Sequence, residues 1–517
     1  KRDPKDRARL LMVRIPGRTS DGDLQGYLPL LGRDDPKLPD WEGQEATGFP
    51  DNWTVGISFF HNVFAREHNQ FVAAFRQRAA TTPDADCGLR DPVRPDRVIR
   101  YRDVTPDQLF EVARLVVSAE IAKIHTIEWT TQLLYNEPLF LGMNANWGGL
   151  PGKQRELPGI VGTGSHTAGW SVANPDDVNG GTNHFGSPFQ FPEEFVSVYR
   201  LHTLLPDVIE YRDARAPNAI AGTVPVVQTF RGKATAFTRD RGLANWALSL
   251  GRQRVGTVQL QNAPRFLQNI RIARLPGTGQ IDIVALDLVR DRERGVPRFN
   301  EFRRQYGLPS LTSYDELVGD ATLASTLRGL YGQHRCDRSK VITRAQRNAD
   351  KTPITDCLGR PDGTLIDNIE DVDTMVGWLG ESTRPHGFAI SETQFVVFIL
   401  NASRRLYSDR FLTSSFRPEF YTTMGLGWVN DNGPGPMTEP APINGHAAQP
   451  VSPLKRVLMR TIPELAAQLA PLHNAFDPWA RDPGVYYSLQ WKPRPGAETD
   501  PAFAATVPSA AAAPRRR

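Results

Sequence analysis

The chain has 517 residues, 40% of them hydrophobic, which is enough for two or three average domains or for one large helical domain with a sizeable core. Its 61 Lys and Arg residues nearly balance its 57 Asp and Glu residues, so the net charge of +4 gives no case for nucleic-acid binding. No apolar run is long enough to span a bilayer and no signal peptide opens the chain, so we expect a cytoplasmic protein, soluble or peripherally membrane-associated.

The cysteines point away from a disulfide scaffold. Cys87, Cys336 and Cys357 are odd in number and form no CxxC pair, a pattern that favours a reducing compartment. His334 lies near two of them in sequence, but the spacing fits no standard zinc site. We therefore interpret these residues as scattered loop positions.

The first half of the chain predicts two long helices after a looped segment at 1–50. Apolar residues recur at helical spacing from residue 53 to about 77. Thr105 and Pro106 then form the expected start of a second helix, apolar nearly all round and therefore buried on most sides. His125 and Thr130 lie toward its end. Because positions five apart on a 3.6-residue helix differ by about 140°, these side chains would flank a ligand rather than stack on one face.

A third helix is predicted for residues 192–207, after a Gly-rich and Ser-rich excursion at 150–190. Pro192 followed by two glutamates favours a helix start, because acidic residues suit the N-terminal dipole. Tyr199 and His202 are three residues apart and so share one helical face. Taken alone, a Tyr and a His on an apolar face are most often satisfied core residues.

The second half predicts further helices between polar segments. One is expected near 239–250, and a long one from about Glu392 that continues through 430. Residues 332–370 form a polar insertion, and a last helix lies within 454–479. The end of the chain is low in complexity and is expected to be disordered.

Several separate motifs resemble the animal-type haem peroxidase superfamily, in its cyclooxygenase and fatty-acid α-dioxygenase branch. They are REHN at 66–69, HTIEWT at 125–130, YRLHTLLPD at 199–207, DLVRDRERGVPRFN at 287–300 and ASRRL with DRF at 402–411. The resemblance implies a mainly α, haem-peroxidase-like helical domain with long loops and little β. It divides the chain into an N-terminal extended segment (1–50), a catalytic domain (51–480) and a C-terminal tail (481–517).

The resemblance implies roles for the residues around the third helix. His202 would be the axial ligand of a haem b iron, which a neutral imidazole binds well, and Tyr199 the radical-carrying catalytic residue. Asp287 falls where relatives place the partner of the proximal imidazole, and an acidic partner fixes the tautomer and raises ligand basicity. The alternative is an ion-pair cluster of Asp287 with the arginines of its own segment, Arg290, Arg292 and Arg294.

A second set of residues would hold the carboxylate of the substrate. HTIEWT supplies His125 and Thr130, although a core histidine bonded to threonine or backbone is the alternative. Arginine clamps carboxylates well because its planar fork donates two parallel hydrogen bonds. Arg410 is our choice for the third group, with Arg404 and Arg405 as rivals. A surface salt bridge is the ordinary alternative for each arginine.

The REHN residues and the start of the chain are less easily placed. Buried polar groups must find partners, so residues 66–69 are interpreted as a network that ties helices together, with direct haem contact as the alternative. Relatives carry a distal haem histidine and a calcium loop before this helix. Here no histidine precedes His61, and DWEG at 40–43 is a poor calcium loop. Either family sequence is missing from this chain, or this member has lost peroxide activation.

The implied activity is that of a haem-dependent dioxygenase acting on fatty acids. Hydrogen peroxide would activate the haem, Tyr199 would remove a hydrogen atom from the α-carbon, and O2 would add there to give a 2-hydroperoxy acid. Burial of the acyl tail would contribute about 0.8 kcal/mol per methylene. Two alternatives stay open: a haem peroxidase of small phenols or halides, and a catalytically inactive scaffold that keeps the fold.

Overall fold

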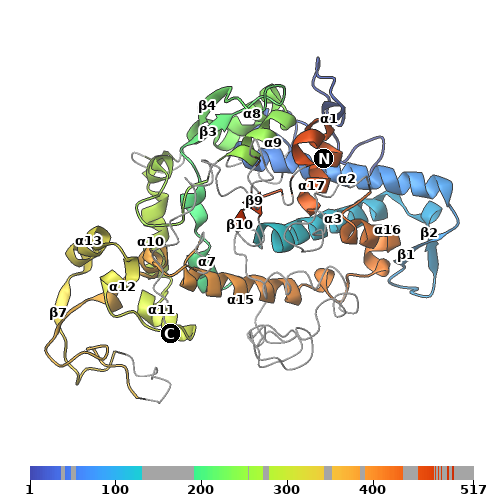
Figure 1. Ribbon diagram of the computed structural model, residues 1–517. Coiled ribbons are helices and arrows are strands. Elements are labelled where there is room, and N and C mark those ends of the chain that lie inside the picture. The colour runs from blue at the N-terminus through green and yellow to red at the C-terminus, as the bar shows by residue number, and fades with distance from the viewer. Residues whose placement is uncertain are drawn as a thin grey trace. The chain divides into compact units, whose positions relative to one another are not determined.

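The computed structural model describes residues 1–35, 41–47, 54–130, 191–253, 255–271, 279–342, 352–384, 390–434 and 452–470, with 472, 475–476, 479, 486–487 and 492–493 beyond them. The chain forms two compact units (Figure 1). Unit 1 comprises Lys1–Ala168, Val208–Arg254 and Asp409–Arg517, and unit 2 comprises Gly169–Asp207 and Val255–Ser408. Both are built mainly from helices, which confirms the mainly α fold. None of the described helices combines the length and the apolar character that crossing a bilayer requires.

Unit 1 contains the two long helices that the sequence predicts near its start. Its α-helices are α1 (Asp21–Leu24), α2 (Val55–Thr81), α3 (Pro106–Lys123), α8 (Ala234–Arg241), α9 (Leu243–Arg252), α16 (Pro418–Asn430), α17 (Pro453–Thr461) and α18 (Ala466–Leu469). Shorter helical segments are η2 (Tyr101–Asp103), η3 (Ile124–Trp129), η6 (Val226–Thr229), η7 (Arg231–Lys233), η11 (Arg410–Leu412) and η12 (Pro463–Leu465).

Within the described residues, every strand of unit 1 belongs to a two-stranded antiparallel sheet. They pair β1 (Asp86–Arg90) with β2 (Val98–Arg100), β3 (Val208–Tyr211) with β4 (Gly222–Pro225), and β9 (Tyr486–Tyr487) with β10 (Lys492–Pro493).

Helix α3 begins where the sequence predicts, but it does not continue as a regular α-helix to the end of the predicted segment. The Thr105 side chain accepts from the Gln108 N–H and the Gln108 side chain accepts from the Thr105 N–H, a reciprocal cap with Pro106 in the first turn. After Lys123 the chain continues as the π-helix η3, in which hydrogen bonds join residues five apart.

Aromatic side chains join the helices of unit 1 into one core. Helices α2, α3 and α16 pack together, and α17 packs on α2. Phe71 of α2 meets Trp428 of α16 edge-on, with ring centroids 5.3 Å apart. Gly88 lets α16 approach β1, because its φ of +95° suits glycine and a Cβ there would lie 2.8 Å from Pro418.

The REHN residues 66–69 form the predicted buried network. The Glu67 carboxylate accepts from Trp428 Nε1 at 2.9 Å and from Arg460 Nη2 at 2.6 Å. Arg460 Nη2 also lies 3.3 Å from a carboxylate oxygen of Glu120. The other three residues reach backbone or amide groups of distant segments: Arg66 donates to Gly26 O and Thr461 O, His68 Nε2 lies 2.9 Å from Ala8 O, and Asn69 exchanges two hydrogen bonds with Leu10.

Unit 2 is assembled from shorter helices. These are α7 (Glu193–Val198), α10 (Ile283–Glu293), α11 (Phe299–Gln305), α12 (Tyr314–Val318), α13 (Ala321–Tyr331), α14 (Thr374–Gly380) and α15 (Glu392–Ser408), with the 3-10 segments η5 (Leu201–Leu204), η8 (Arg265–Asn269) and η9 (Ile369–Asp371). Two small antiparallel pairs, β5 (Ile270–Arg271) with β6 (Gln280–Ile281) and β7 (Gln333–Arg335) with β8 (Leu365–Asp367), complete the described strands.

Helix α14 is the centre of unit 2, because it contacts α7, α10, α11, α12 and α15. A buried ion pair fastens this centre: Arg303 of α11 binds Glu381, the residue after α14, and each side chain is 2% exposed. The long helix predicted from Glu392 to about residue 430 is wrong in extent. Helix α15 ends at Ser408, and α16 begins at Pro418 after the short segment η11.

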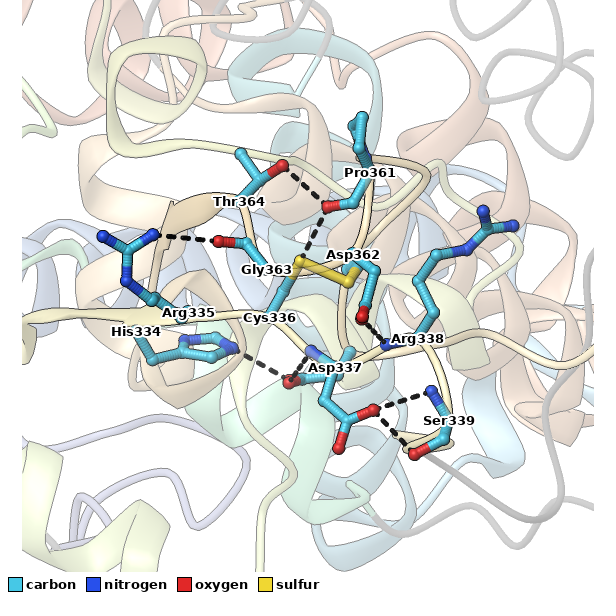
Figure 2. The surroundings of a disulfide bond; sticks show 12 residues. His334, Arg335, Cys336, Asp337, Arg338, Ser339, Pro361, Asp362, Gly363 and Thr364 are labelled. Carbon is cyan, nitrogen blue, oxygen red and sulfur yellow. Dashed lines mark hydrogen bonds and ion pairs between the residues drawn. A yellow bond between two sulfur atoms is a disulfide. The ribbon is translucent and has the colours of Figure 1, made fainter.

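The interpretation of the cysteines is corrected by a disulfide between Cys336 and Cys357 (Figure 2). Both cysteines are buried with Ile366, their Cα atoms are 4.8 Å apart, and only Cys87 of the three is free. In the same segment, His334 Nε2 lies 3.0 Å from an oxygen of Asp356. Sequence spacing could not reveal the pair, because β7 and β8 bring the two ends of the insertion together. Because Cys336 and Cys357 are paired, the cysteines no longer favour a reducing compartment.

Candidate functional site

Two short helical segments replace the single helix predicted for residues 192–207. Helix α7 ends at Val198, and η5 begins at Leu201. Between them Tyr199 has φ −90° and ψ 47°, and Arg200 has φ −111° and ψ 68°, both outside the helical range. The prediction that Tyr199 and His202 share one helical face is therefore wrong.

A carboxylate on α10 accounts for the break in the helix. One oxygen of Asp287 lies 2.8 Å from Nη1 of Arg200, and the other lies 2.9 Å from Nδ1 of His202. Residues two apart on a regular helix point to opposite sides and could not both reach one carboxylate. The irregular backbone at 199–200 brings both side chains to Asp287.

His202 keeps one ring nitrogen available for a ligand. Its Nδ1 is buried against Asp287, while the side chain as a whole is 33% exposed. The ring N–H is not aligned on the oxygen, so the 2.9 Å distance describes an electrostatic contact rather than a linear hydrogen bond. With Nδ1 turned inward, Nε2 is the nitrogen on the accessible side of the ring.

A second buried carboxylate lies one turn further along α10. Oδ2 of Asp291 accepts a hydrogen bond of 2.5 Å from the Ser197 hydroxyl. Burial raises the pKa of Asp291, and the charges of Arg200 and Arg290 oppose this rise. Oδ1 of Asp291 and both Nε and Nη2 of Arg200 are buried without a hydrogen-bond partner. Buried polar atoms are seldom left unpaired, so this concentration of them is typical of a binding site.

Tyr199 lies in a stack of aromatic rings. Its ring centroid is 5.1 Å from that of Phe195 and 5.4 Å from that of Phe398, with interplanar angles of 17° and 19°. The residue is 42% exposed, and its partial burial raises the pKa of its hydroxyl from the ordinary value. Tyr199 is therefore a neutral phenol at neutral pH, held flat against its neighbours.

These residues fit the proximal side of a haem. The iron of a haem has four porphyrin nitrogens and needs one protein ligand on this side, which Nε2 of His202 can provide. The buried carboxylate on Nδ1 is the usual outer partner of a metal-binding histidine. In the part of the chain that the structure describes, no group of three or more His, Cys, Asp or Glu side chains could hold a bare metal ion.

The arginines of α10 pair with carboxylates other than Asp287. Arg290 and Arg294 lie 2.7 Å and 3.8 Å from Glu193, and Arg292 lies 2.6 Å from Asp373. The alternative interpretation of Asp287, as a member of their ion-pair cluster, therefore does not describe its contacts. Its role beside an iron-ligating histidine stays a prediction.

His125 and Thr130 lie at the two ends of the π-helix η3. The Thr130 backbone N–H and hydroxyl both donate to the carbonyl of His125, the hydroxyl at 2.7 Å. Residues five apart are thus neighbours on successive turns, and the expected separation of about 140° is wrong. The His125 ring stacks on Trp129 at 4.9 Å, and burial lowers its pKa, so it is a neutral imidazole at neutral pH.

The three candidate carboxylate-binding arginines lie on two elements, Arg404 and Arg405 on α15 and Arg410 on η11. Arg410 is exposed on η11, which contacts α3, the helix that continues into η3. Its guanidinium carbon is 4.8 Å from the ring of Phe411. Arg405 of α15 lies 5.8 Å from the ring of Phe191, and the side chain of Arg404 is outside the described residues.

In unit 2 the structure places His202 in contact with Asp287, and Tyr199 lies three residues before His202 in the same unit. His125, Thr130 and Arg410 belong to unit 1, and the binding of a carboxylate by these three residues stays a prediction. The excursion at 150–190, the first residue of DWEG and the end of the chain lie outside the described residues.

Sequence reasoning missed three members of the site, namely Arg200, Asp291 and Ser197. A signal for Asp291 was present, because two aspartates four apart would share one face if the segment formed a helix. No comparable signal marks Arg200 or Ser197. Their positions depend on where α7 ends, which the spacing of apolar residues does not reveal.

Comparison with known proteins identifies similar sequences over most of the chain. The model of the animal haem peroxidase family matches residues 13–337. The alpha-dioxygenase PIOX of Oryza sativa subsp. japonica is 31% identical over 462 residues, which are 88% of this chain and 62% of that protein. The Nicotiana tabacum protein of the same name is 32% identical, covering 86% of this chain and 58% of that protein. This chain thus spans about three fifths of the length of these relatives.

Solved structures show the same similarity. The crystal structure of Oryza sativa fatty acid alpha-dioxygenase matches with a TM-score of 0.61 at 30% identity, covering 85% of this chain and 60% of that one. A structure of its tyrosine-to-phenylalanine variant with palmitic acid matches equally well. Peroxidase A from Dictyostelium discoideum, 16% identical with a TM-score of 0.51, shares the fold alone. With most of its length matched by the family model, the chain belongs to the animal haem peroxidase family.

Proposed function

We propose that this chain carries the catalytic centre of a haem-dependent fatty-acid α-dioxygenase, which converts a long-chain fatty acid to its 2-hydroperoxide. The observation that carries the proposal is the stretch 199–202. It presents a neutral phenol in an aromatic stack and, three residues later, an imidazole whose inner nitrogen faces a buried carboxylate. The similarity to plant alpha-dioxygenases, one of them solved with palmitic acid, supports the choice of substrate class.

The proposal includes haem b as the cofactor, with hydrogen peroxide and O2 as co-reactants. His202 would hold the iron through Nε2, and Asp287 would keep the proton on Nδ1. When bound, the haem supplies the one-electron oxidation that turns the Tyr199 phenol into a radical. The aromatic neighbours of Tyr199, Phe195 and Phe398, stack on its ring and cover part of it.

The remaining chemistry belongs to Tyr199 and the substrate. The tyrosyl oxygen takes a hydrogen atom from the α-carbon, and O2 adds to the carbon radical that is left. The resulting peroxyl radical takes a hydrogen atom back from the phenol, which gives the 2-hydroperoxide and regenerates the tyrosyl radical. An acyl chain offers many similar C–H bonds, so regiochemistry requires that the carboxylate end be held in place.

The carboxylate would be held by His125, Thr130 and Arg410, or by Arg404 or Arg405 in place of Arg410. The lowered pKa of His125 makes it a neutral hydrogen-bond donor, so the positive charge must come from an arginine. The π-helix supports this use of His125 and Thr130, because it sets them on successive turns rather than on opposite faces.

The test is Tyr199→Phe in the full-length holoenzyme, measured as oxygen uptake with palmitic acid. We expect uptake to fall to background while the Soret band stays unchanged, because the substitution removes only the hydroxyl. Tyr306→Phe is the matched control, since Tyr306 packs on Phe302 of α11 and is not part of the site. It should retain full activity.

Two outcomes would replace the proposal with the alternatives. Peroxide-dependent oxidation of small phenols that survives Tyr199→Phe, without oxygen uptake on palmitic acid, would make the protein a small-molecule peroxidase. A purified full-length protein that shows no Soret band after incubation with haem would make it a scaffold without this chemistry.

A further inference from the structure

Arg200 is the least expected member of the proximal cluster, which comprises Ser197, Arg200, His202, Asp287 and Asp291. Its side chain is 16% exposed, and it lies two residues before His202 in a stretch that is neither α7 nor η5. Nη1 contacts Asp287 at 2.8 Å, and the charge also acts on Asp291, whose pKa it lowers against the effect of burial. One guanidinium thus faces two buried carboxylates.

The contacts of Asp287 make it a bridge between a cation and the imidazole. A carboxylate beside Nδ1 draws the Nδ1 proton toward itself. Nε2 then becomes a stronger electron-pair donor to a metal ion. A guanidinium on the other oxygen attracts the same negative charge and weakens that effect. Asp287 is 7% exposed, and charges in such an environment interact more strongly than they do in water.

We propose that Arg200 is a positioning residue, which binds Asp287 and neutralises its charge. This neutralisation limits how strongly Nε2 of His202 donates its electron pair to a haem iron. The inference rests on the proposed haem ligation by His202. A merely structural ion pair would hold α7 to α10 equally well without any effect on His202. The convergence of Arg200 and His202 on a single carboxylate is what links the cation to the imidazole.

The experiment measures the Fe(III)/Fe(II) midpoint potential of the full-length holoenzyme and its variants. Arg200→Gln keeps a hydrogen-bond donor near Asp287 but removes the charge. We expect a shift to more negative potential, because a more anionic Asp287 strengthens His202 as a donor and stabilises the ferric iron. Asp287→Asn should shift the potential in the opposite direction.

Two further variants separate charge from position. Arg200→Lys keeps the positive charge but holds it less firmly beside Asp287. Its midpoint potential should therefore shift in the same direction as that of Arg200→Gln, but by less. Arg290→Gln is the matched control, since Arg290 is an arginine of α10 that pairs with Glu193 at 2.7 Å rather than with Asp287. It should leave the potential unchanged.

The double variant decides whether Arg200 acts through Asp287. In the Asp287→Asn background, Arg200→Gln should shift the potential by less than half of its shift in the wild-type background. The iron–histidine stretching frequency of the ferrous form, measured by resonance Raman, should rise in Arg200→Gln alone, whereas the double variant should stay near the value of the Asp287→Asn single variant.

Several results would overturn the inference. A potential in Arg200→Gln equal to that of Arg290→Gln, or a shift of the same size with and without Asp287, would leave Arg200 a structural residue. Should Arg200→Gln fail to fold, Arg200→Lys carries the test, and a zero or positive shift contradicts the proposal. A wild-type protein without a Soret band would instead contradict the proposed function itself.

Discussion

The REHN cluster of unit 1 (residues 66–69 with Glu120, Trp428 and Arg460) and the proximal cluster of unit 2 (Ser197, Arg200, His202, Asp287 and Asp291) are both polar and largely buried. They differ in how completely they are paired. Each of the four REHN residues bonds to a distant segment, and the unpaired atoms there are Arg66 Nη2 and Glu120 Oε2. In the proximal cluster Arg200, His202, Asp287 and Asp291 all have buried atoms without an aligned hydrogen bond.

This difference in pairing distinguishes polar groups that stabilise the fold from polar groups that can bind a ligand. A buried network that is mostly paired holds segments together and leaves few polar atoms to bind a ligand. A partly satisfied cluster beside a one-third exposed imidazole has polar atoms and an accessible nitrogen to offer. The contrast predicts that substitutions in the first cluster alter stability, whereas those in the second alter haem binding.

The largest effect on stability is expected for Arg460→Met. The substitution leaves Glu67 and Glu120 buried without their cation, which should lower the free energy of unfolding by about 3–5 kcal/mol. Urea denaturation followed by circular dichroism measures the loss. Arg94→Met, at an exposed pair with Asp91, is the control and should cost under about 1 kcal/mol. A loss below about 1 kcal/mol for Arg460→Met would contradict a structural role for the network.

The disulfide gives unit 2 a covalent constraint in addition to its buried ion pairs. Opening the loop between Cys336 and Cys357, 21 residues apart, should lower the free energy of unfolding by roughly 3 kcal/mol. The Cys336→Ala/Cys357→Ala variant measures this in denaturant. Thiol titration of the unfolded, unreduced protein should find one reactive thiol, from Cys87. Three reactive thiols would show that the bond does not form.

A smaller, pH-dependent effect is expected for Glu120→Gln. Burial first, and the charge of Glu67 second, raise the pKa of Glu120 well above its ordinary value. Because the folded state favours the protonated form, stability is highest below the unfolded pKa and declines as pH rises toward the folded pKa. The variant should therefore match wild type near pH 4 and exceed its thermal midpoint at pH 7. Equal midpoints at both pH values would contradict the raised pKa.

The sequence was informative where a residue's role depends on its near neighbours. Thr105 and Pro106 predicted the start of α3, and the polar interruption at 66–69 predicted a buried network. It was uninformative where distant segments decide the local structure. The break after Val198 follows from a carboxylate on α10, far along the chain, and the disulfide follows from the pairing of β7 with β8.

The site was predictable as a set of residues and not as a geometry. The resemblance named Tyr199, His202 and Asp287, and the structure places the last two 2.9 Å apart. Helical periodicity then gave the wrong backbone for both residue sets, because α7 ends early and α3 continues as a π-helix. A period of 3.6 is an average for regular helices, and functional segments commonly depart from it.

The central claim is that His202 holds a haem iron from a cluster that the fold does not need for stability. It is tested most directly by His202→Gly with and without added imidazole, followed by the Soret band of the full-length protein. We expect the band to be lost or displaced, then restored by imidazole, while the free energy of unfolding of the apoprotein changes by less than about 1 kcal/mol. The account is contradicted if the Soret band of His202→Gly equals that of wild type and does not change when imidazole is added.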